Sequence, residues 1–498
     1  MDALSALLCL LLVLITLYWA LIGRSKSHNL PPGPKGWPLF GSIFQISATD
    51  SHKDFLKLSE QYGDVIAVNM AGNPVVVLNS ADAIREAFFS TTTRDVFAGR
   101  PRSFYAKYSD RGPSLLFTGF CKEMMQQRKI YMKTLKMYGE EGMVLENIIR
   151  DEIQIVVKKI RERRGQPIDI GALVIPALAN IILTVMSGKS FEYDDPALLA
   201  TLEFELYNVQ MLTGHIATIM SAFPFLRHIP LGYGKLFKGH RRSYDTLVYY
   251  FVTLAKEAFD PATSRGLVAD LFRLQSEYPW ITDDKIKGAL RDCVGAGIGT
   301  TRGTILAFFL VILHKPVVMS KIQSEISSVI GRCRAPCVAD RVKMPYTEAV
   351  VMELLRYISH VPMGAPHSTV DDVTFRGYVI PAKTTVLTNL WAVHHDDRIW
   401  EEPWEFLPER FLDEEGNVVP PEHKNRRNWL VFGTGRRACP GEYFGRSRVF
   451  LFITTLLQQF NFRPCAEHPL PSHDPRGYTT GITLHPPRYY LLADDAQM

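Results

Sequence analysis

The chain contains little cysteine and little net charge. Its 498 residues include seven cysteines, an odd number at irregular spacings, and the formal net charge is only +5. This cysteine pattern does not predict the disulfide framework of a secreted protein and fits reduced cytosolic thiols better. A weak and evenly spread positive charge does not predict a nucleic-acid-binding protein. It suits an acidic protein partner or an anionic membrane surface.

Linkers, repeats and low-complexity segments are also absent after the first fifty residues. Length alone would suggest two or three domains, but no Ser/Gly tract, charge block or internal repeat divides the chain. With 47% hydrophobic residues the chain can bury a large core. The sequence therefore predicts one large domain at residues 51–498 behind an N-terminal appendage.

The N-terminal appendage has the composition of a membrane anchor. Residues 3–23 carry no charge, and a helix of this length, at about 1.5 Å per residue, spans the roughly 30 Å apolar core of a bilayer. Asp2 precedes this segment while Arg24 and Lys26 follow it, which places the rest of the chain in the cytosol. A cleaved signal peptide would need the opposite charge order and a small-residue cleavage site. We predict a retained anchor at 1–23 and a basic, proline-rich linker at 24–50.

Apolar periodicity predicts a mainly α fold with small antiparallel β-sheets. Residues 64–79 alternate around a Gly-Asn-Pro turn and predict a β-hairpin. Short strand-like runs recur at 373–379, 384–388 and near 481–492, whereas most of the chain before residue 316 has helical periodicity.

The longest predicted helix, at 285–314, carries three glycines in its middle. Gly295, Gly297 and Gly299 weaken a helix and favour a local opening of its hydrogen-bond ladder. A dinucleotide-binding loop is not predicted, because its third glycine would stand at Thr300 and because a helical segment rather than a strand comes before it.

A single cysteine lies in a glycine-rich turn near the C-terminus. Cys439 directly precedes an apolar-periodic run at 442–460 that predicts a helix. The positive end of a helix favours a thiolate, and a thiolate is a strong axial ligand for haem iron. Arg436 and Arg437 add positive charge, and either could pair a haem propionate. A lone cysteine in such a turn is otherwise most often a structural residue.

The whole pattern F-x-x-G-x-R-x-C-x-G is met at Phe432, Gly435, Arg437, Cys439 and Gly441. It resembles the haem-binding signature of the cytochrome P-450 family. The resemblance implies the triangular, helix-rich P-450 fold and a bound haem b (iron protoporphyrin IX), with Cys439 as the axial ligand of the iron. It also implies that Phe432, Arg437 and Gly441 contact the cofactor.

The run from Ala296 to Thr301 resembles the oxygen-activation motif of the same family, [A/G]-G-x-[D/E]-T-[T/S]. The resemblance implies that Ala296 lies against the cofactor and that the Thr300 hydroxyl is catalytic, steadying bound oxygen and helping to deliver protons. Gly299 stands where the family usually has a carboxylate. The missing acid could slow proton delivery, divert oxygen to peroxide, or be replaced by water or substrate oxygens. If its absence limits the reaction, we expect Gly299→Asp to improve coupling.

A second interpretation of Thr300 needs no catalysis, because helix threonines often bond a backbone carbonyl one turn back. Arg302 follows the motif, and the sequence assigns it no role beyond a solvated or salt-bridged helix face.

Three residues upstream of the cysteine loop have implied structural roles. Glu353 and Arg356 are three residues apart on one predicted helix face, and Arg410 belongs to a Pro-Glu-Arg-Phe segment. In the family such residues form a buried salt-bridged cluster, so the resemblance implies the same here.

Two further basic residues match positions that contact haem propionates in the family. Arg128 lies four residues after Met124, where the family often has a tryptophan, and His367 follows a Gly-Ala-Pro turn. Additional basic residues near Arg128 and around the cysteine loop predict a patch for an acidic electron donor. These residues are Lys122, Lys129, Lys133, Lys136, Arg436, Arg446 and Arg448.

Together these features predict a membrane-anchored haem-thiolate monooxygenase of the endoplasmic reticulum, resembling microsomal animal members that oxidise steroids or xenobiotics. The resemblance implies a lipophilic substrate, O2, and electrons from NADPH-cytochrome P-450 reductase, with cytochrome b5 as a second candidate donor. Two other classes stay open: a haem-thiolate isomerase or lyase that needs neither O2 nor reductase, and a non-catalytic haem- or ligand-binding protein.

Overall fold

The computed structural model describes residues 10, 12–13, 29–37, 40–47, 49–101, 104–109, 114–139, 144–163 and 165–496. The predicted anchor at 1–23 lies almost wholly outside the described residues, as does part of the predicted linker. Among the described residues, the helix Ile170–Ser187 and the segment Asp283–His314 are long and apolar enough to cross a membrane. Most of each is buried within the fold, as is usual for core helices.

Helices make up most of the body, and the confirmed mainly α class follows from the apolar periodicity of the chain. The α-helices are α2 (Ser51–Tyr62), α3 (Ala81–Phe89), α4 (Lys122–Gly139), α5 (Val144–Glu162), α6 (Ile170–Ser187), α7 (Pro196–Leu212), α8 (Gly214–Ala222), α9 (Tyr233–Val248), α10 (Leu254–Glu257), α11 (Leu267–Leu274), α12 (Asp283–Gly297), α13 (Gly299–His314), α14 (Pro316–Val329), α15 (Pro345–Ile358), α16 (Leu390–His394), α17 (Lys424–Arg427) and α18 (Glu442–Gln459).

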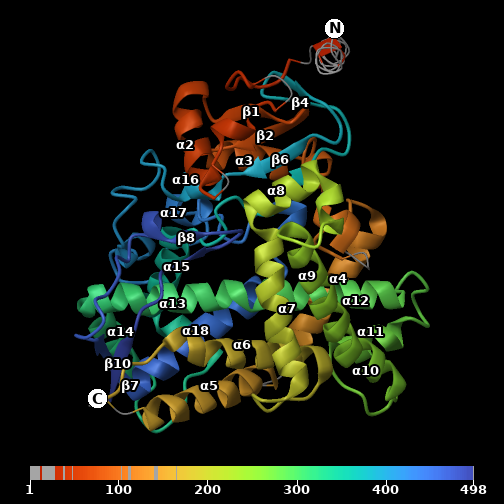
Figure 1. The fold of residues 1–498 in the computed structure, drawn as a ribbon. Helices are drawn as coiled ribbons and strands as arrows, with labels where there is room; N and C mark the ends of the chain where they lie inside the picture. Colours follow the sequence, from red (N-terminus) through yellow and green to blue (C-terminus); the bar gives the residue numbers. More distant parts are fainter. Residues whose placement is uncertain are drawn as a thin grey trace.

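The strands are short and gather at the edges of the helical body (Figure 1). They are β1 (Val65–Met70), β2 (Asn73–Leu78), β3 (His367–Ser368), β4 (Val373–Phe375), β5 (Tyr378–Ile380), β6 (Thr385–Thr388), β7 (Phe460–Pro464), β8 (Thr479–Thr480), β9 (Leu484–His485) and β10 (Leu491–Asp495).

The largest sheet has the strand order β1-β2-β6-β3. The predicted hairpin at 64–79 is present as β1 and β2, with Val65 opposite Leu78. The other sheet pairs are antiparallel as well, except that β2 runs parallel to β6, so this sheet is mixed. The run 373–379 folds into a second hairpin, β4–β5, because Arg376 and Gly377 take positive φ angles of 50° and 81° between the strands.

The predicted long helix crosses the whole body as α12 and α13 (Figure 1). Thr282 caps its start by accepting a hydrogen bond from the backbone N–H of Lys285. The ladder opens at Ile298, within the glycine-rich stretch, so the predicted local opening is confirmed. From Ile305 to Ile312 every residue of α13 is fully buried, because apolar side chains on all its faces meet α6, α15 and α18.

A buried ion-pair cluster joins α15 to the 3-10 turn Pro408–Phe411. Glu353 accepts two hydrogen bonds from Arg356, at 2.7 and 2.8 Å, and its Oε1 lies 3.3 Å from Nε of Arg410. Arg356 also donates hydrogen bonds to the backbone carbonyls of His394, Pro403 and Glu405. Because Glu353 and Arg356 are fully buried, each charge depends on its partner for compensation.

We predict that Glu353→Gln lowers the free energy of unfolding by about 3–5 kcal/mol, because two guanidinium groups lose their buried counter-charge. Glu409→Gln is the control, since the pair of Glu409 with Lys321 is about half exposed and should cost less than about 1 kcal/mol. Chemical denaturation of both variants measures the difference. Equal destabilisation would contradict the assigned importance of the cluster.

Candidate active site

The cysteine loop is held by its own backbone. Cys439 donates its backbone N–H to the carbonyl of Phe432 at 2.8 Å, which closes the loop directly before α18. Gly433 and Gly435 take φ angles of +66° and +69°, a conformation that favours glycine. At Gly435 a side chain would also collide with the backbone carbonyl of Phe88.

The Cys439 side chain is exposed, yet the protein packed around it raises the pKa of its thiol. Burial is the main cause, while the backbone N–H of Gly441 and the charges of Arg128 and Arg448 act in the opposite direction. The backbone N–H at the start of the helix thus favours the thiolate, as expected, but burial outweighs its effect. Coordination to a metal ion deprotonates a thiol outright, so an iron bound at this sulfur would bring Cys439 into its thiolate form.

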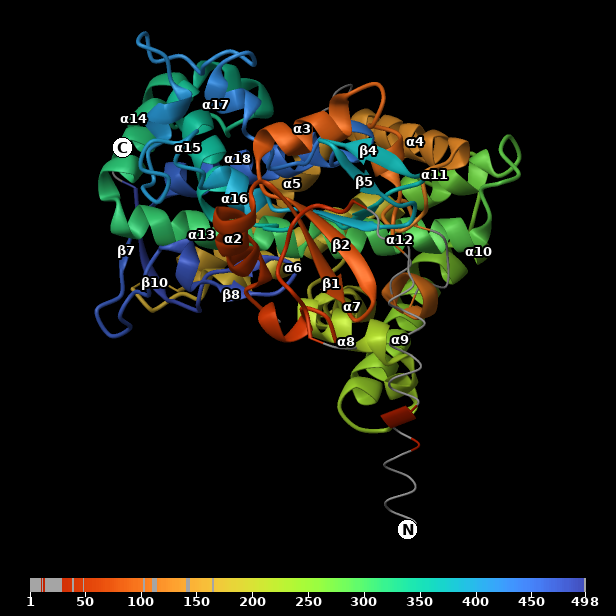
Figure 2. The same ribbon diagram turned by 90° about the horizontal axis from the view of Figure 1, so that it is seen from above.

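Residues on the α12–α13 opening face the same region of the fold. Helices α13 and α18 pack against each other, as both views show (Figures 1 and 2). The link next to the cysteine loop is Arg448, which is almost fully buried and donates to the carbonyl of Gly297 at 2.7 Å. Ala296 is exposed although it lies in a largely buried helix, and Thr300 is part-exposed. The hydroxyl of Thr300 donates to the carbonyl of Ala296 at 2.7 Å.

Three arginines and a histidine converge beside the loop. Arg128 donates to the backbone carbonyl of Ala438, next to the cysteine. Arg437 donates to the carbonyls of Ala98, Leu115 and Thr118, at 2.7 to 3.1 Å. Both arginines therefore bond backbone oxygens. Among the described residues no carboxylate forms an ion pair with either guanidinium group, so their positive charges are not neutralised.

The third arginine, Arg100, has no spacing pattern in the sequence that could have identified it. Its guanidinium bonds the carbonyls of Leu116, Ala365 and Pro366. Burial, together with the charges of Arg437 and Arg128, lowers its pKa to about 9 against the opposing charge of Asp292. Burial and Arg128 likewise lower the pKa of Arg437 to about 10. Like charges held this close favour binding of an anion between them.

His367 is buried beside this cluster. Its Nδ1 donates to the carbonyl of Phe97 at 3.1 Å, and its ring lies 4.4 Å from that of Phe88. Burial holds the pKa of His367 well below its ordinary value, and Arg100 adds to the effect. With its one N–H given to Phe97, the neutral ring could donate to an anion from Nε2 only by taking up a second proton, which a bound anion would favour.

The residues present fit a haem. A cysteine sulfur offers a ligand for iron, while Arg100, Arg128 and Arg437 offer cationic partners for two propionates. The small side chain of Ala296 permits a flat ligand to approach the helix backbone. Met124, in place of a tryptophan, is fully buried and fills space without a polar contact.

The predicted basic patch is smaller than the sequence suggested. Lys122, Lys129 and Lys133 are exposed on α4. Arg446 is instead paired with Glu348 and Glu442, and Arg448 is buried, so including these two was wrong. Both residues lie on α18 at positions that face the interior of the fold. The sequence did not indicate this, because a charged residue is ordinarily expected on the surface.

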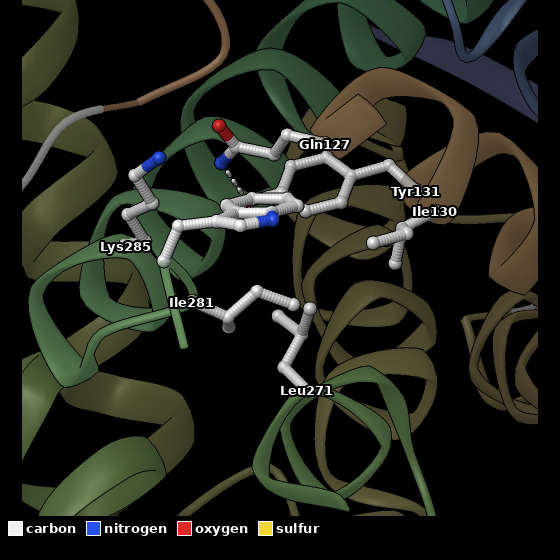
Figure 3. Close-up of a pocket in the computed structure, with 7 residues that line it drawn as sticks. Gln127, Ile130, Tyr131, Leu271, Ile281 and Lys285 are labelled. Carbon is white, nitrogen blue, oxygen red and sulfur yellow. Dashed lines mark hydrogen bonds between the residues drawn. The ribbon is translucent and has the colours of Figure 1, made fainter. Parts of the chain in front are cut away.

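A small pocket lies elsewhere, between α4, α11 and the start of α12 (Figure 3). Apolar side chains dominate it, and Gln127 donates to the hydroxyl of Tyr131 at 2.7 Å on one wall. Its volume of about 10 Å³ is roughly that needed for one water molecule. This pocket is therefore a packing gap rather than a substrate site.

Comparison with known proteins agrees with this geometry. The family model described as Cytochrome P450 matches residues 31–493. Cytochrome P450 2D4 of Rattus norvegicus is 33% identical over 94% of this chain and 93% of its own length. Cytochrome P450 2D6 of Homo sapiens is 31% identical over 95% of this chain and 96% of its own length. Vitamin D(3) 25-hydroxylase of Sus scrofa is 31% identical over 95% of both.

We predict that Gly435→Ala destabilises the cysteine loop more than Gly433→Ala. Both substitutions force a Cβ into the left-handed region, at about 1–2 kcal/mol each. Only position 435 adds a collision, because nothing lies within 4 Å of a Cβ at 433. Denaturant unfolding of the two variants measures the difference, and equal losses would show that the close packing against Phe88 does not hold the loop.

Proposed function

Because this chain belongs to the cytochrome P450 family, and is thus a haem b monooxygenase, we propose that it inserts one oxygen atom from O2 into a lipophilic organic substrate, with electrons from NADPH-cytochrome P-450 reductase. The observation that carries the proposal is the placement of Cys439 beside Arg128, which belongs with Arg100 and Arg437 to a group of arginines whose guanidinium groups bond backbone carbonyls. When bound, haem b supplies the redox chemistry that activates dioxygen.

We assign the roles of the protein's own residues as follows. Cys439 is the axial ligand of the iron, and Arg128, Arg437 and His367 hold the propionates together with Arg100. Phe432, Gly441 and Ala296 border the cofactor, and Thr300 is the catalytic hydroxyl. This hydroxyl donates to the Ala296 carbonyl, so the lone pairs of its oxygen can accept a hydrogen bond from a neighbouring donor. Glu353, Arg356 and Arg410 hold the cysteine side of the fold.

A substrate of steroid or xenobiotic type is supported by the relatives. One of them is named a vitamin D(3) 25-hydroxylase, and the chain is similar to it along nearly its whole length. A lipophilic substrate also agrees with the proposed domain order, an anchor at 1–23 and a linker at 24–50 before the haem domain at 51–498. Such an anchor would hold the domain on the cytosolic face of the endoplasmic reticulum, where apolar substrates partition into the bilayer.

The surface proposed for the electron donor is the exposed face of α4. Lys122, Lys129 and Lys133 lie on the same helix as Arg128, which contacts the cysteine loop. Positive side chains there suit an acidic partner and would mainly raise its association rate. The reductase is the expected partner, with cytochrome b5 as a second donor.

An isomerase or lyase acting on a peroxide is the alternative function. The observation that favours it is Gly299, because such a reaction needs no proton delivery from an acid at that position. Thr300 argues against it, since its hydroxyl would have no role there.

The ratio of organic product to NADPH consumed tests the proposal. Purified protein, reductase and a panel of steroids, fatty acids and aromatic xenobiotics are combined with and without NADPH. We expect NADPH-dependent product from at least one member, and none from Cys439→Ser, whose reduced carbon monoxide complex should lack the thiolate spectrum. Product formed from a lipid hydroperoxide without NADPH would instead establish the isomerase.

A further inference from the structure

The carboxyl group of Glu205 lies against the glycine at which the α12–α13 motif lacks an acid. Glu205 belongs to α7, which packs against α12. A Cβ built on Gly299 would lie 2.7 Å from Oε1 and 3.9 Å from Cδ of Glu205. The first distance is shorter than a Cβ tolerates, so the carboxyl occupies the space into which a side chain at position 299 would extend. An acid at position 299 would therefore displace the Glu205 carboxyl from its present place.

Glu205 is not tied to another side chain by a hydrogen bond. Its side chain is 4% exposed, and among the described residues its carboxyl oxygens meet no side-chain donor at hydrogen-bond distance, although the backbone N–H of Gly299 acts on the group. Burying an unpaired carboxylate is costly, so the group is more stable in its protonated form. Burial accordingly raises the pKa of Glu205 to about 8, although the backbone N–H of Gly299 and the charge of Arg302 oppose the shift. At neutral pH the carboxyl therefore holds a proton that it can give away.

Arg302 provides the counter-charge for this group. It lies on α13, is only part-exposed, and its Nε is buried without a hydrogen-bond partner among the described residues. Burial lowers the pKa of Arg302, and the negative charges of Asp169 and Glu205 raise it. Arg302 can therefore stabilise the carboxylate of Glu205 after its proton has left. Arg302, to which the sequence assigned no role, thus interacts electrostatically with Glu205, the acid that the motif itself does not supply.

We propose that Glu205 is the acid of this active site, supplied by α7 in place of the residue missing at Gly299, and that it delivers protons to the hydroxyl of Thr300. The inference rests on the proposed monooxygenase function. In the step, the O–H bond of Glu205 breaks and its proton passes to Oγ1 of Thr300, directly or over one water, while the proton that Oγ1 already carries passes on to the reacting oxygen, so the hydroxyl stays neutral. The resulting carboxylate faces the N–H of Gly299 and Arg302, and it regains a proton from solvent. Glu205 acts through Thr300 and is a positioning and proton-supplying residue.

The first test compares Glu205→Gln, which keeps the shape but cannot give a proton, with Glu203→Gln, an exposed change on the same helix. Thr300→Ala is the reference for lost proton delivery. With the haem-loaded enzyme and a substrate identified above, we expect Glu205→Gln to lower the product-to-NADPH ratio about tenfold, with peroxide formed instead. Glu203→Gln should match wild type. Unchanged coupling in Glu205→Gln would overturn the inference.

A second readout does not depend on turnover. Infrared spectra of the purified holoprotein at neutral pH should contain the carbonyl band of a protonated carboxylic acid, which is lost in Glu205→Gln and kept in Glu203→Gln. Absence of this difference would show that Glu205 is already ionised and would overturn the inference. The melting temperature of Glu205→Gln should not fall, because the variant buries no charge. A fall accompanied by haem loss would assign Glu205 a structural role instead.

A swap of the acid between the helices separates chemistry from packing. Gly299→Asp alone should lower coupling, because its side chain displaces the carboxyl of Glu205 and brings a second acid beside it. The double variant Glu205→Ala/Gly299→Asp should regain much of the coupling that Glu205→Ala loses. A gain in coupling from Gly299→Asp alone, or no rescue in the double variant, would contradict the inference. If wild type forms no NADPH-dependent product at all, the proposed function fails, and the infrared result alone decides whether Glu205 holds a proton.

Discussion

Positive charge held around one sulfur atom is the constraint on which the rest of this structure depends. Arg100, Arg128 and Arg437 donate hydrogen bonds to backbone carbonyls, which carry no net charge, so their positive charges remain available for an anion. Such an arrangement is unfavourable on its own, and burial lowers the pKa of each guanidinium. The two propionates of a haem bound here would offset the repulsion of the arginines, and its iron would stabilise the Cys439 thiolate. Cofactor binding and local stability would therefore be coupled at this site.

At the α12–α13 opening, the acid that the motif usually supplies from its own helix is supplied by another helix, α7. A glycine at position 299 would leave the motif without an acid if the helix were considered alone. The fold brings Glu205 of α7 to the same place, and Gly299 is the residue whose lack of a side chain admits it. Arg302 then complements the relocated acid.

Sequence reasoning succeeded where the signal lies within a short stretch of chain. The β1–β2 hairpin, the break in the long helix and the cysteine loop each depend on neighbouring residues, so their local patterns were sufficient. The parallel pairing of β2 with β6, the approach of Arg100 and the contact between Glu205 and Gly299 join distant segments, and no local spacing encodes them. Arg448 was misjudged for the same reason, because its burial is decided by the helix against which α18 packs.

The central claim is that Cys439 ligates the haem iron, and X-ray absorption at the iron edge tests it most directly. The account predicts one sulfur atom in the first coordination shell of the purified ferric protein. That sulfur should disappear in Cys439→Ser and remain in Cys465→Ser, which changes a buried cysteine outside the loop. A first shell made only of nitrogen and oxygen in the wild-type protein, or sulfur retained in Cys439→Ser, would contradict the account.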